Sequence, residues 1–342
     1  MDLNTVFTIT PARHRGDLAL LDAQVAPLAG GSDLFADPQT HLTGLVDLQT
    51  LGWPALTLTT DAGTPDTGPG AATGTDAHTG ERATGTTPGL VIAATCTIAE
   101  LSRLAAAPGW TAHPLIYQCC TALYGSFKIW NVATVGGNLC ASLPAGPMTS
   151  LAAALDAEVL IWRRDGSDER MPAASFVTGN TTNALRTGDV LRSIHVPTSS
   201  LAARTAYRKI ALSPLGRSGA VLIGRLDRAD LSDSDDTTAR DASDGTGRFV
   251  LTVTAGTVRP VQLRYDSLPD AGTLAQDIAA IDCWFTDAHG AADWRRAVSG
   301  VLGEEIRAEL EQQPEPRQEP EPRQEPEPAA RDQAAPRNGD RS

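Results

Sequence analysis

The chain has 342 residues, of which 41% are hydrophobic, and its formal net charge at pH 7 is −13. This length predicts two or three domains with ample core. The negative charge argues against nucleic acid as a partner, because binding phosphates needs a basic face. No run approaches the roughly 18 apolar residues of a membrane span, so we expect no membrane segment. The first residues lack the charged-then-apolar layout of a secretory signal, which makes a cytoplasmic location the expectation.

The chain contains five cysteines, and none of them belongs to a CxxC pair. An odd number without such spacing argues against a disulfide framework and against a zinc or iron–sulfur site built by this chain alone. We therefore predict no metal site. The adjacent Cys119 and Cys120 lie in a predicted helix, where small apolar core residues are expected.

The sequence of residues 1–52 predicts a small βαβ-like unit. The second strand of this unit ends in Gly30-Gly31. Ser32 or Asp33 is suited to cap a short helix through Leu34 and Phe35, and a ligand-binding role for these two side chains is an equal alternative. The apolar runs predict strands at Val6–Ile9, Val25–Ala29 and Leu45–Leu48 and a short helix at Asp17–Ala23.

The middle of the chain alternates strands and helices. Between two predicted strands, residues 61–89 are rich in Gly, Thr and Ala without apolar periodicity, which predicts a mobile loop. Thr97 and Glu100 fit a capping box at the start of a helix. The predicted strands are Leu56–Thr59, Leu90–Ala94, Glu158–Trp162 and Val190–Val196, and the predicted helices are Thr97–Ala106, Pro114–Leu123 and Leu151–Leu155.

A Ser/Thr/Ala linker near residues 197–203 predicts a domain boundary. Beyond it we expect an acidic loop at 228–247, whose aspartate spacing does not fit a calcium loop. From residue 312 the chain becomes a Pro/Glu/Arg/Gln repeat, which predicts a disordered, solubilising tail over 312–342. The predicted elements are strands at Thr205–Leu212, Ala220–Leu226 and Arg248–Ala255 and amphipathic helices at Leu274–Ile281 and Trp294–Leu310.

Two Gly-Gly segments follow apolar stretches, one in Pro27–Phe35 and one in Asn131–Asp156. Adjacent glycines let backbone N–H groups turn outward, and an arc of amides is a cradle for phosphate. The side chain of Asn138 can both donate and accept hydrogen bonds. Each segment alone is more often a tight turn. Together they indicate one extended phosphate-bearing ligand held from two sides.

The segments LAGGSDL, LVDL, LVIAATCTIAEL, WNVATVGGNL and LAAALDAEV, in this order, resemble the FAD-binding medium subunit of molybdopterin-containing hydroxylases, the xanthine dehydrogenase and carbon monoxide dehydrogenase group. The resemblance runs from about Val6 to Leu310. It implies an α+β protein with a two-subdomain FAD-binding fold of the vanillyl-alcohol oxidase type over residues 1–198, divided into 1–52 and 53–198. A C-terminal domain of antiparallel sheet plus helices would follow over 204–311.

The resemblance also implies where FAD is bound. Tyr124 would lie near the flavin, Leu191 would pack on its ring system, and Arg208 or Lys209 would reach it with a cation; Tyr124 and Leu191 have alternatives as ordinary core residues. No GxGxxG fingerprint opens a helix here. The first wall of the dinucleotide site would be Pro27, Leu28, Ala29, Gly30, Gly31, Ser32, Asp33 and Leu34, and the second would be Thr134, Val135, Gly136, Gly137 and Asn138.

Three positions depart from the family pattern. Pro147 stands where an Asp usually contacts the cofactor, Trp130 replaces a common Arg, and Ala93 replaces a common Gly. The polar contact of the missing Asp is therefore lost or supplied elsewhere.

The sequence carries no visible apparatus for oxidising a substrate, and the catalytic residues stay unassigned. The resemblance implies an electron-transfer subunit of a molybdenum hydroxylase complex. It would take electrons from the [2Fe–2S] clusters of a partner, beside a molybdopterin-binding large subunit, and pass them to NAD⁺ or O₂. A stand-alone flavin oxidase or reductase and a redox-inactive scaffold subunit are the alternatives, since fold alone does not decide function.

Overall fold

The computed structural model describes residues 3–59, 88–123, 125–213, 216–228 and 247–312. The predictions of a mobile loop at 61–89, an acidic loop at 228–247 and a disordered tail at 312–342 fall almost wholly outside the described residues. Tyr124 also lies outside them. In the ranges that are described, no helix is long and apolar enough to cross a membrane.

The N-terminal unit is a parallel three-stranded sheet with strand order β1-β3-β2. β1 begins at Thr8 rather than at Val6, and the predicted helix Asp17–Ala23 is a 3-10 helix at Arg15–Leu20. Its small core, the N-terminal core, is formed by Ala12, Leu18, Leu21, Val46, Leu48 and Val190. The strands are β1 Thr8–Pro11, β2 Val25–Leu28 and β3 Gly44–Asp47, and the 3-10 helix Gln49–Leu51 follows them.

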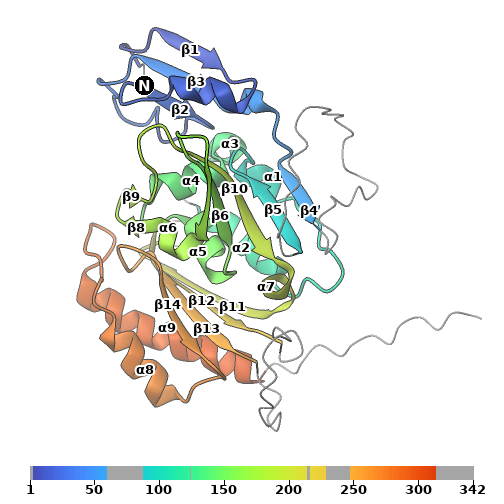
Figure 1. Cartoon of the computed structure of the whole chain (residues 1–342). Helices are drawn as coiled ribbons and strands as arrows, with labels where there is room; N and C mark the ends of the chain where they lie inside the picture. Colours follow the sequence, from blue (N-terminus) through green and yellow to red (C-terminus); the bar gives the residue numbers. More distant parts are fainter. Residues whose placement is uncertain (1–2, 60–87, 124, 214–215, 229–246, 313–342) are drawn as a thin grey trace, which may run out of the picture. The chain divides into compact units, whose positions relative to one another are not determined.

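The middle part is built on an antiparallel five-stranded sheet with strand order β4-β5-β10-β6-β7 (Figure 1). Apolar side chains of β5, β6 and β10 alternate into the main core, as period-two patterning predicts. The strands are β4 Leu56–Thr59, β5 Gly89–Ala93, β6 Glu158–Trp162, β7 Asp168–Pro172 and β10 Val190–Pro197, with a small hairpin of β8 Val177–Gly179 and β9 Thr182–Asn183.

Seven helices belong to the described part of this middle region. The capping box of Thr97 and Glu100 is confirmed, but the helix that it starts ends at Leu101 instead of Ala106. The carbonyl of Leu104 lies 2.7 Å from the Nε2 atom of His113 and so serves a contact outside a helix. The helices are α1 Ile98–Leu101, α2 His113–Ala122, α3 Phe127–Val132, α4 Val135–Ala141, α5 Pro147–Ala154, α6 Ala173–Phe176 and α7 Thr198–Ala202.

The C-terminal part is an antiparallel sheet of strand order β11-β12-β13-β14. The three predicted strands and both predicted helices are confirmed, and β14 is an addition. Helices α8 and α9 cover one face of the sheet, while α2 and α5 lie against the other (Figure 1). The elements are β11 Arg204–Ala211, β12 Ser218–Leu226, β13 Phe249–Thr254, β14 Val261–Tyr265, α8 Ala271–Ala280 and α9 Ala292–Gln312.

The middle and C-terminal parts share a core. Val221, Ile223 and Ala255 of the C-terminal part belong to the main core. A buried hydrogen bond of 2.7 Å joins the hydroxyls of Ser150 and Thr254. Residues 1–312 accordingly form one compact unit. The mixture of helices with antiparallel sheets confirms the predicted α+β class, and the domain limits at residues 52, 198 and 204 stay predictions.

Candidate FAD-binding site

The Gly-Gly pair of TVGGN lies inside a helix, so the predicted loop is wrong. Thr134 is the N-cap of α4, and its Oγ1 atom accepts a hydrogen bond of 3.0 Å from the amide of Gly137. A Cβ atom at Gly136 would lie 2.4 Å from the Cβ atom of Ala94. Glycine is therefore required because α4 approaches the end of β5 closely. This close contact outweighs the low helix propensity of glycine.

The amides of this segment are already engaged, which corrects the prediction that they turn outward toward a phosphate. Val135 donates to the carbonyl of Cys96 over 2.8 Å and Gly136 to that of Ala94 over 3.0 Å. The amide of Asn138 donates to the carbonyl of Thr134 over 2.9 Å. Together with the N-cap bond of Gly137, these bonds fasten the segment to β5 and to its own first turn.

The Gly30-Gly31 segment differs from the second segment in the hydrogen bonding of its backbone amides. None of the five consecutive amides of residues 30–34 donates a hydrogen bond to another described residue. Gly31 has a φ of 69°, a conformation that glycine adopts without strain. The predicted short helix is instead a turn, closed by bonds of 2.9 Å from Phe35 to Gly31 and from Ala36 to Asp33. Unpaired successive amides in such a turn form a cradle for an anion.

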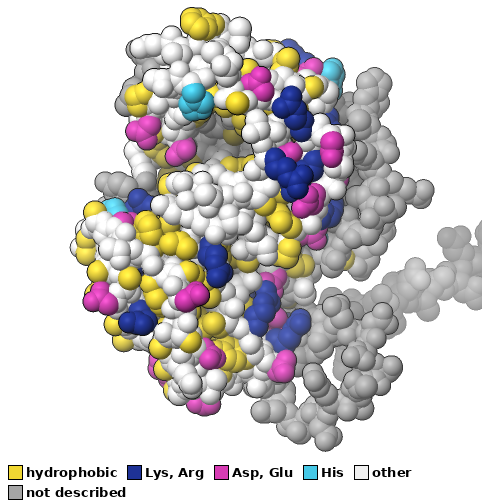
Figure 2. All heavy atoms as spheres, turned by 60° about the vertical axis from the view of Figure 1, so that its left-hand side comes forward, with side chains coloured by type: hydrophobic (Ala, Val, Ile, Leu, Met, Phe, Trp, Pro, Cys, Tyr) yellow, Lys and Arg dark blue, Asp and Glu magenta, His cyan; other side chains and the backbone are white. Residues whose placement is uncertain are grey.

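The two segments meet at Gly30. A Cβ atom at this position would lie 1.6 Å from the carbonyl oxygen of Val132, so the backbone of the first segment rests on the residues that lead into Thr134. Val132 and Phe35, both partly exposed at 44% and 40%, add apolar surface here. The surface is hollowed below the N-terminal unit (Figure 2). Sequence reasoning missed Val132 and Phe35, although an apolar residue beside each glycine segment is a visible signal.

The predicted wall residues differ in access. Pro27 and Asp33 are exposed, and Leu28 through Ser32 together with Leu34 are half-buried. On the second wall Thr134, Val135 and Gly136 are buried, while Gly137 and Asn138 are half-buried. The accessible part of the predicted site thus lies on the first segment and at the end of the second.

The side chain of Asn138 makes a hydrogen bond within the protein in addition to any contact with a ligand. Its Oδ1 atom accepts a hydrogen bond of 3.0 Å from the amide of Met148, near the start of α5. Its NH₂ group donates to no described residue. Pro147, in place of the usual Asp, is buried as the first residue of α5, where a missing N–H costs nothing.

Arg208 and Lys209 lie on opposite faces of β11. Arg208 binds Glu305 through Nε over 2.9 Å and Glu309 through Nη2 over 2.7 Å, so it faces α9. Its neighbour Tyr207 packs against the main core, and strand alternation places Lys209 on that same face. Burial lowers the pKa of the Lys209 ammonium, and no described carboxylate contributes to that shift. Of the two candidate cations, Lys209 is thus the one that faces the middle part.

Leu191 is buried at 3% exposure and belongs to the main core, opposite Ile161 on β6. Its position gives no evidence that this side chain reaches the hollow below the N-terminal unit. The main core accounts for its leucine without a ligand.

Known proteins share both a domain and the fold with this chain. Residues 81–199 match the model of the family described as the FAD-binding domain in molybdopterin dehydrogenase. That range includes the second segment and Leu191, but not the first segment or Lys209. No curated protein sequence matches the chain.

Solved structures with low sequence identity have the same fold. A chain of quinoline 2-oxidoreductase from Pseudomonas putida 86 is similar with a TM-score of 0.65 and 16% identity, covering 90% of this chain and 98% of that one. A chain of CO dehydrogenase from Oligotropha carboxidovorans is similar with a TM-score of 0.66 and 19% identity, covering 90% and 99%. For carbon monoxide dehydrogenase from Hydrogenophaga pseudoflava the values are 0.63, 17%, 88% and 96%.

The family match confirms FAD as the expected cofactor and, because the family is one of dehydrogenases, an oxidoreductase flavoprotein as the expected class of protein. The solved structures show the shared fold. Five amides of the first segment donate to no other described residue, so the residues present fit a cofactor that carries phosphates. Residues 81–199 are thus similar to the FAD-binding domain in molybdopterin dehydrogenase.

Proposed function

We propose that this chain is the FAD-bearing electron-transfer subunit of a molybdenum hydroxylase complex, and that the amides of residues 30–34 bind the pyrophosphate of FAD. The observation that supports this role is the run of five unpaired amides resting on the residues before Thr134. The cofactor then lies between the unit 1–52 and the subdomain 53–198, with Asn138 offering its NH₂ group from the second wall.

The amide arc suits a pyrophosphate for an electrostatic reason. Hydrogen bonds from neutral donors to an ionised oxygen are about twice as strong as those between neutral groups. Donors that are already oriented lose little entropy on binding. Phe35 and Val132 exclude water at the edge of this arc and offer apolar surface to the rest of the nucleotide.

Lys209 is the residue that tunes the flavin. It comes from the C-terminal part, which we propose spans 204–311, and it faces the middle part without a carboxylate partner among the described residues. FAD, when bound, supplies one- and two-electron redox chemistry. A fixed cation beside it favours the form that carries more negative charge.

The partners of the complex follow from the same resemblance. We propose a molybdopterin-binding large subunit and a [2Fe–2S] subunit as electron donor, with NAD⁺ or O₂ as acceptor. The similar carbon monoxide dehydrogenase from Hydrogenophaga pseudoflava was solved in a form that lacks the Mo-pyranopterin moiety of its molybdenum cofactor, and an enzyme with such a cofactor supports a partner of this kind. Co-purification with two further subunits from the native host is the observation that separates this role from a stand-alone flavin enzyme.

The amide arc can be tested by placing a negative charge beside it. Ser32→Glu should weaken FAD binding at least about tenfold, because a carboxylate repels the two phosphate charges at short range. The matched control Thr40→Glu adds the same charge to an exposed residue of the same unit and should bind FAD as the wild type does. Binding is measured by the quenching of flavin fluorescence and the visible absorption spectrum of the loaded protein.

The outcomes of this experiment are distinct. Equal FAD affinity in Ser32→Glu and wild type would show that the pyrophosphate does not lie on residues 30–34. A wild-type protein that is colourless and takes up no added FAD would remove the electron-transfer role and favour the scaffold alternative.

A further inference from the structure

Besides the packing of Val190 in the N-terminal core, two contacts attach the N-terminal unit to the middle part. One is the contact of Gly30 with the carbonyl of Val132, beside the proposed pyrophosphate site. The other is a stack of two guanidinium groups and two indole rings from Arg15, Trp53, Trp162 and Arg192, here named the arginine–tryptophan stack.

The rings and cations of this stack lie at contact distances. The Cζ atom of Arg192 is 4.2 Å from the ring centroid of Trp53 and 5.5 Å from that of Trp162. Arg15 covers Trp162 with its Cζ atom 4.8 Å from the centroid. The two indoles meet edge to face, with centroids 5.3 Å apart and planes at 89°. Each cation lies within the roughly 6 Å at which a ring attracts it.

A bulge in β10 directs Arg192 into the stack. The register between β10 and β6 shifts between Leu191 and Ser193. Leu191 and Ile194, three residues apart, both enter the main core as a result, and Arg192 projects from the other face. A β-bulge re-aims a side chain in this manner.

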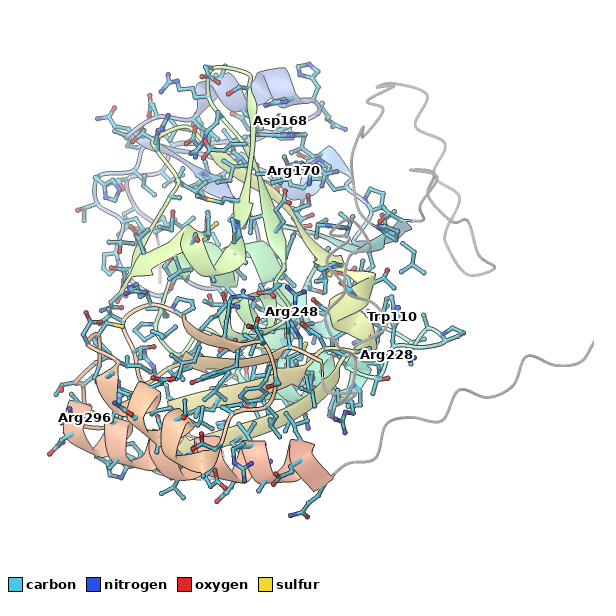
Figure 3. The ribbon with its side chains drawn as sticks, turned by 60° about the horizontal axis from the view of Figure 1, so that its bottom comes forward. Trp110, Asp168, Arg170, Arg228, Arg248 and Arg296 are labelled. Carbon is cyan, nitrogen blue, oxygen red and sulfur yellow. The ribbon has the colours of Figure 1, made fainter. Side chains whose placement is uncertain are left out.

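The stack joins elements that are distant in the chain. Arg15 begins the 3-10 helix of the N-terminal unit and binds Asp168 over 2.7 Å and the carbonyl of Ser167 over 2.7 Å. The β6–β7 hairpin that carries Asp168 and Arg170 extends toward the N-terminal unit (Figure 3). Trp53 packs against both the main core and the N-terminal core. Arg192 is thus the one member of the stack that contacts both indoles.

We propose that Arg192 is a positioning residue for the cofactor: it stacks on Trp53 and Trp162, and because both indoles pack against the N-terminal core, it holds the N-terminal unit, and with it the amides of residues 30–34, in its docked position. This inference rests on the proposed function for its effect on FAD. The amides can bind both phosphate charges only while the unit that carries them is docked. When the unit is already docked, FAD binding does not have to supply the free energy needed to order that unit.

The test compares Arg192→Met, Arg192→Lys and the control Arg103→Met in the full-length chain. Methionine keeps the length and the apolar stem of Arg192 but removes the charge that the indoles attract. Lysine keeps a cation that can lie over a ring and should restore part of the effect. Arg103 is exposed and has no ion pair among the described residues.

Two readouts are measured, and only one involves FAD. In the apo protein, hydrogen exchange over residues 24–48 should accelerate about tenfold in Arg192→Met, while residues 218–226 and 249–265 of the C-terminal sheet keep their rate. The Kd for FAD should rise about tenfold, which corresponds to ~1.4 kcal/mol. Arg103→Met should leave both quantities unchanged.

Each of the other possible results would overturn either the positioning role or the proposed function. Unchanged exchange over residues 24–48 in Arg192→Met would overturn the positioning role. Equal acceleration over residues 218–226 and 249–265 would also overturn it, because that pattern marks a general loss of stability. Accelerated exchange with an unchanged Kd for FAD would also overturn it. Accelerated exchange in a protein whose wild type binds no FAD would keep the docking role of the stack and refute the proposed function instead.

Discussion

Asp156 shows how one residue connects two parts of the chain. It follows α5 with a φ of 48°, a conformation that Asp tolerates better than most residues. Its carboxylate accepts hydrogen bonds from Arg225 over 2.5 Å and from Gln262 over 2.9 Å, and it also binds Arg264. Burial alone would raise the pKa of Asp156, but the hydrogen bond from Arg264 and the charge of Arg225 outweigh it and hold the pKa at about 2.

This low pKa predicts a pH-dependent contribution to stability. Because the pKa is lower in the folded chain than in the unfolded one, the contribution is complete above about pH 5 and is lost as the pH falls toward 2. Asp156→Asn keeps the shape and the backbone preference but removes the charge. Urea unfolding should show it to be less stable by about 2 kcal/mol at pH 7, and the difference should shrink below pH 4.

Asp282→Asn, at an exposed position, is the control and should be within about 0.5 kcal/mol of the wild type. A difference between Asp156→Asn and wild type that stays constant from pH 7 to pH 3 would show that the charge of Asp156 contributes nothing. A cavity of about 310 Å³ lies beside Asp156. The charged side chains that line it pair with one another, Asp156 with Arg264 and Glu158 with Arg170.

At the scale of the element, α4 is a helix whose first turn contradicts local propensity. Two adjacent glycines disfavour a helix by about 1 kcal/mol each relative to Ala. The N-cap bond of Thr134 and the three amide bonds to neighbouring carbonyls offset that cost. What the glycines provide is the approach of α4 to Ala94 at the end of β5.

This explanation predicts opposite signs for the same substitution at two helical glycines. Gly136→Ala should destabilise the chain by about 1–3 kcal/mol, because its Cβ atom would lie 2.4 Å from Ala94 in a packed core. Gly300→Ala in α9 meets nothing within 4 Å and should stabilise the chain by roughly 0.5–1 kcal/mol. Thermal unfolding of both variants measures the difference. Stabilisation by Gly136→Ala would show that close packing is not the reason for this glycine.

At the scale of the whole molecule, the C-terminal sheet is part of the proposed flavin site and not an appendage. Its face toward the middle part contributes Val221 and Ile223 to the main core. The same face carries Lys209, while the opposite face carries Arg208 and is covered by α9. A residue of the C-terminal part can therefore act on a cofactor that we propose is bound between the N-terminal unit and the middle part.

The position of Lys209 predicts an effect on the redox potential. Lys209→Met should lower the midpoint potential of the bound flavin by about 30 mV, because a cation that stabilises the reduced form by ~1.4 kcal/mol is lost. Arg208→Met is the matched control and should leave the potential unchanged, since Arg208 is paired with glutamates of α9. Spectroelectrochemical titration measures both. A shift in Arg208→Met with none in Lys209→Met would reverse the assignment.

Local patterns in the sequence predicted most elements and the family. Period-two apolar runs located β4, β5, β6, β10 and three strands of the C-terminal sheet, and the capping box located the start of α1. These signals are local because strand alternation and helix caps depend on neighbours within a few residues. The order of five segments, two of which contain a Gly-Gly pair, indicated the FAD-binding family whose model residues 81–199 match.

Only the tertiary structure decided what the glycines and cations do. Whether an amide is free depends on carbonyls distant in sequence, such as those of Ala94 and Cys96 for the second segment. Whether Arg208 or Lys209 faces the middle part depends on which face of β11 meets α9. Hydrogen-bond partners and buried faces arise when elements pack, and no local pattern contains them.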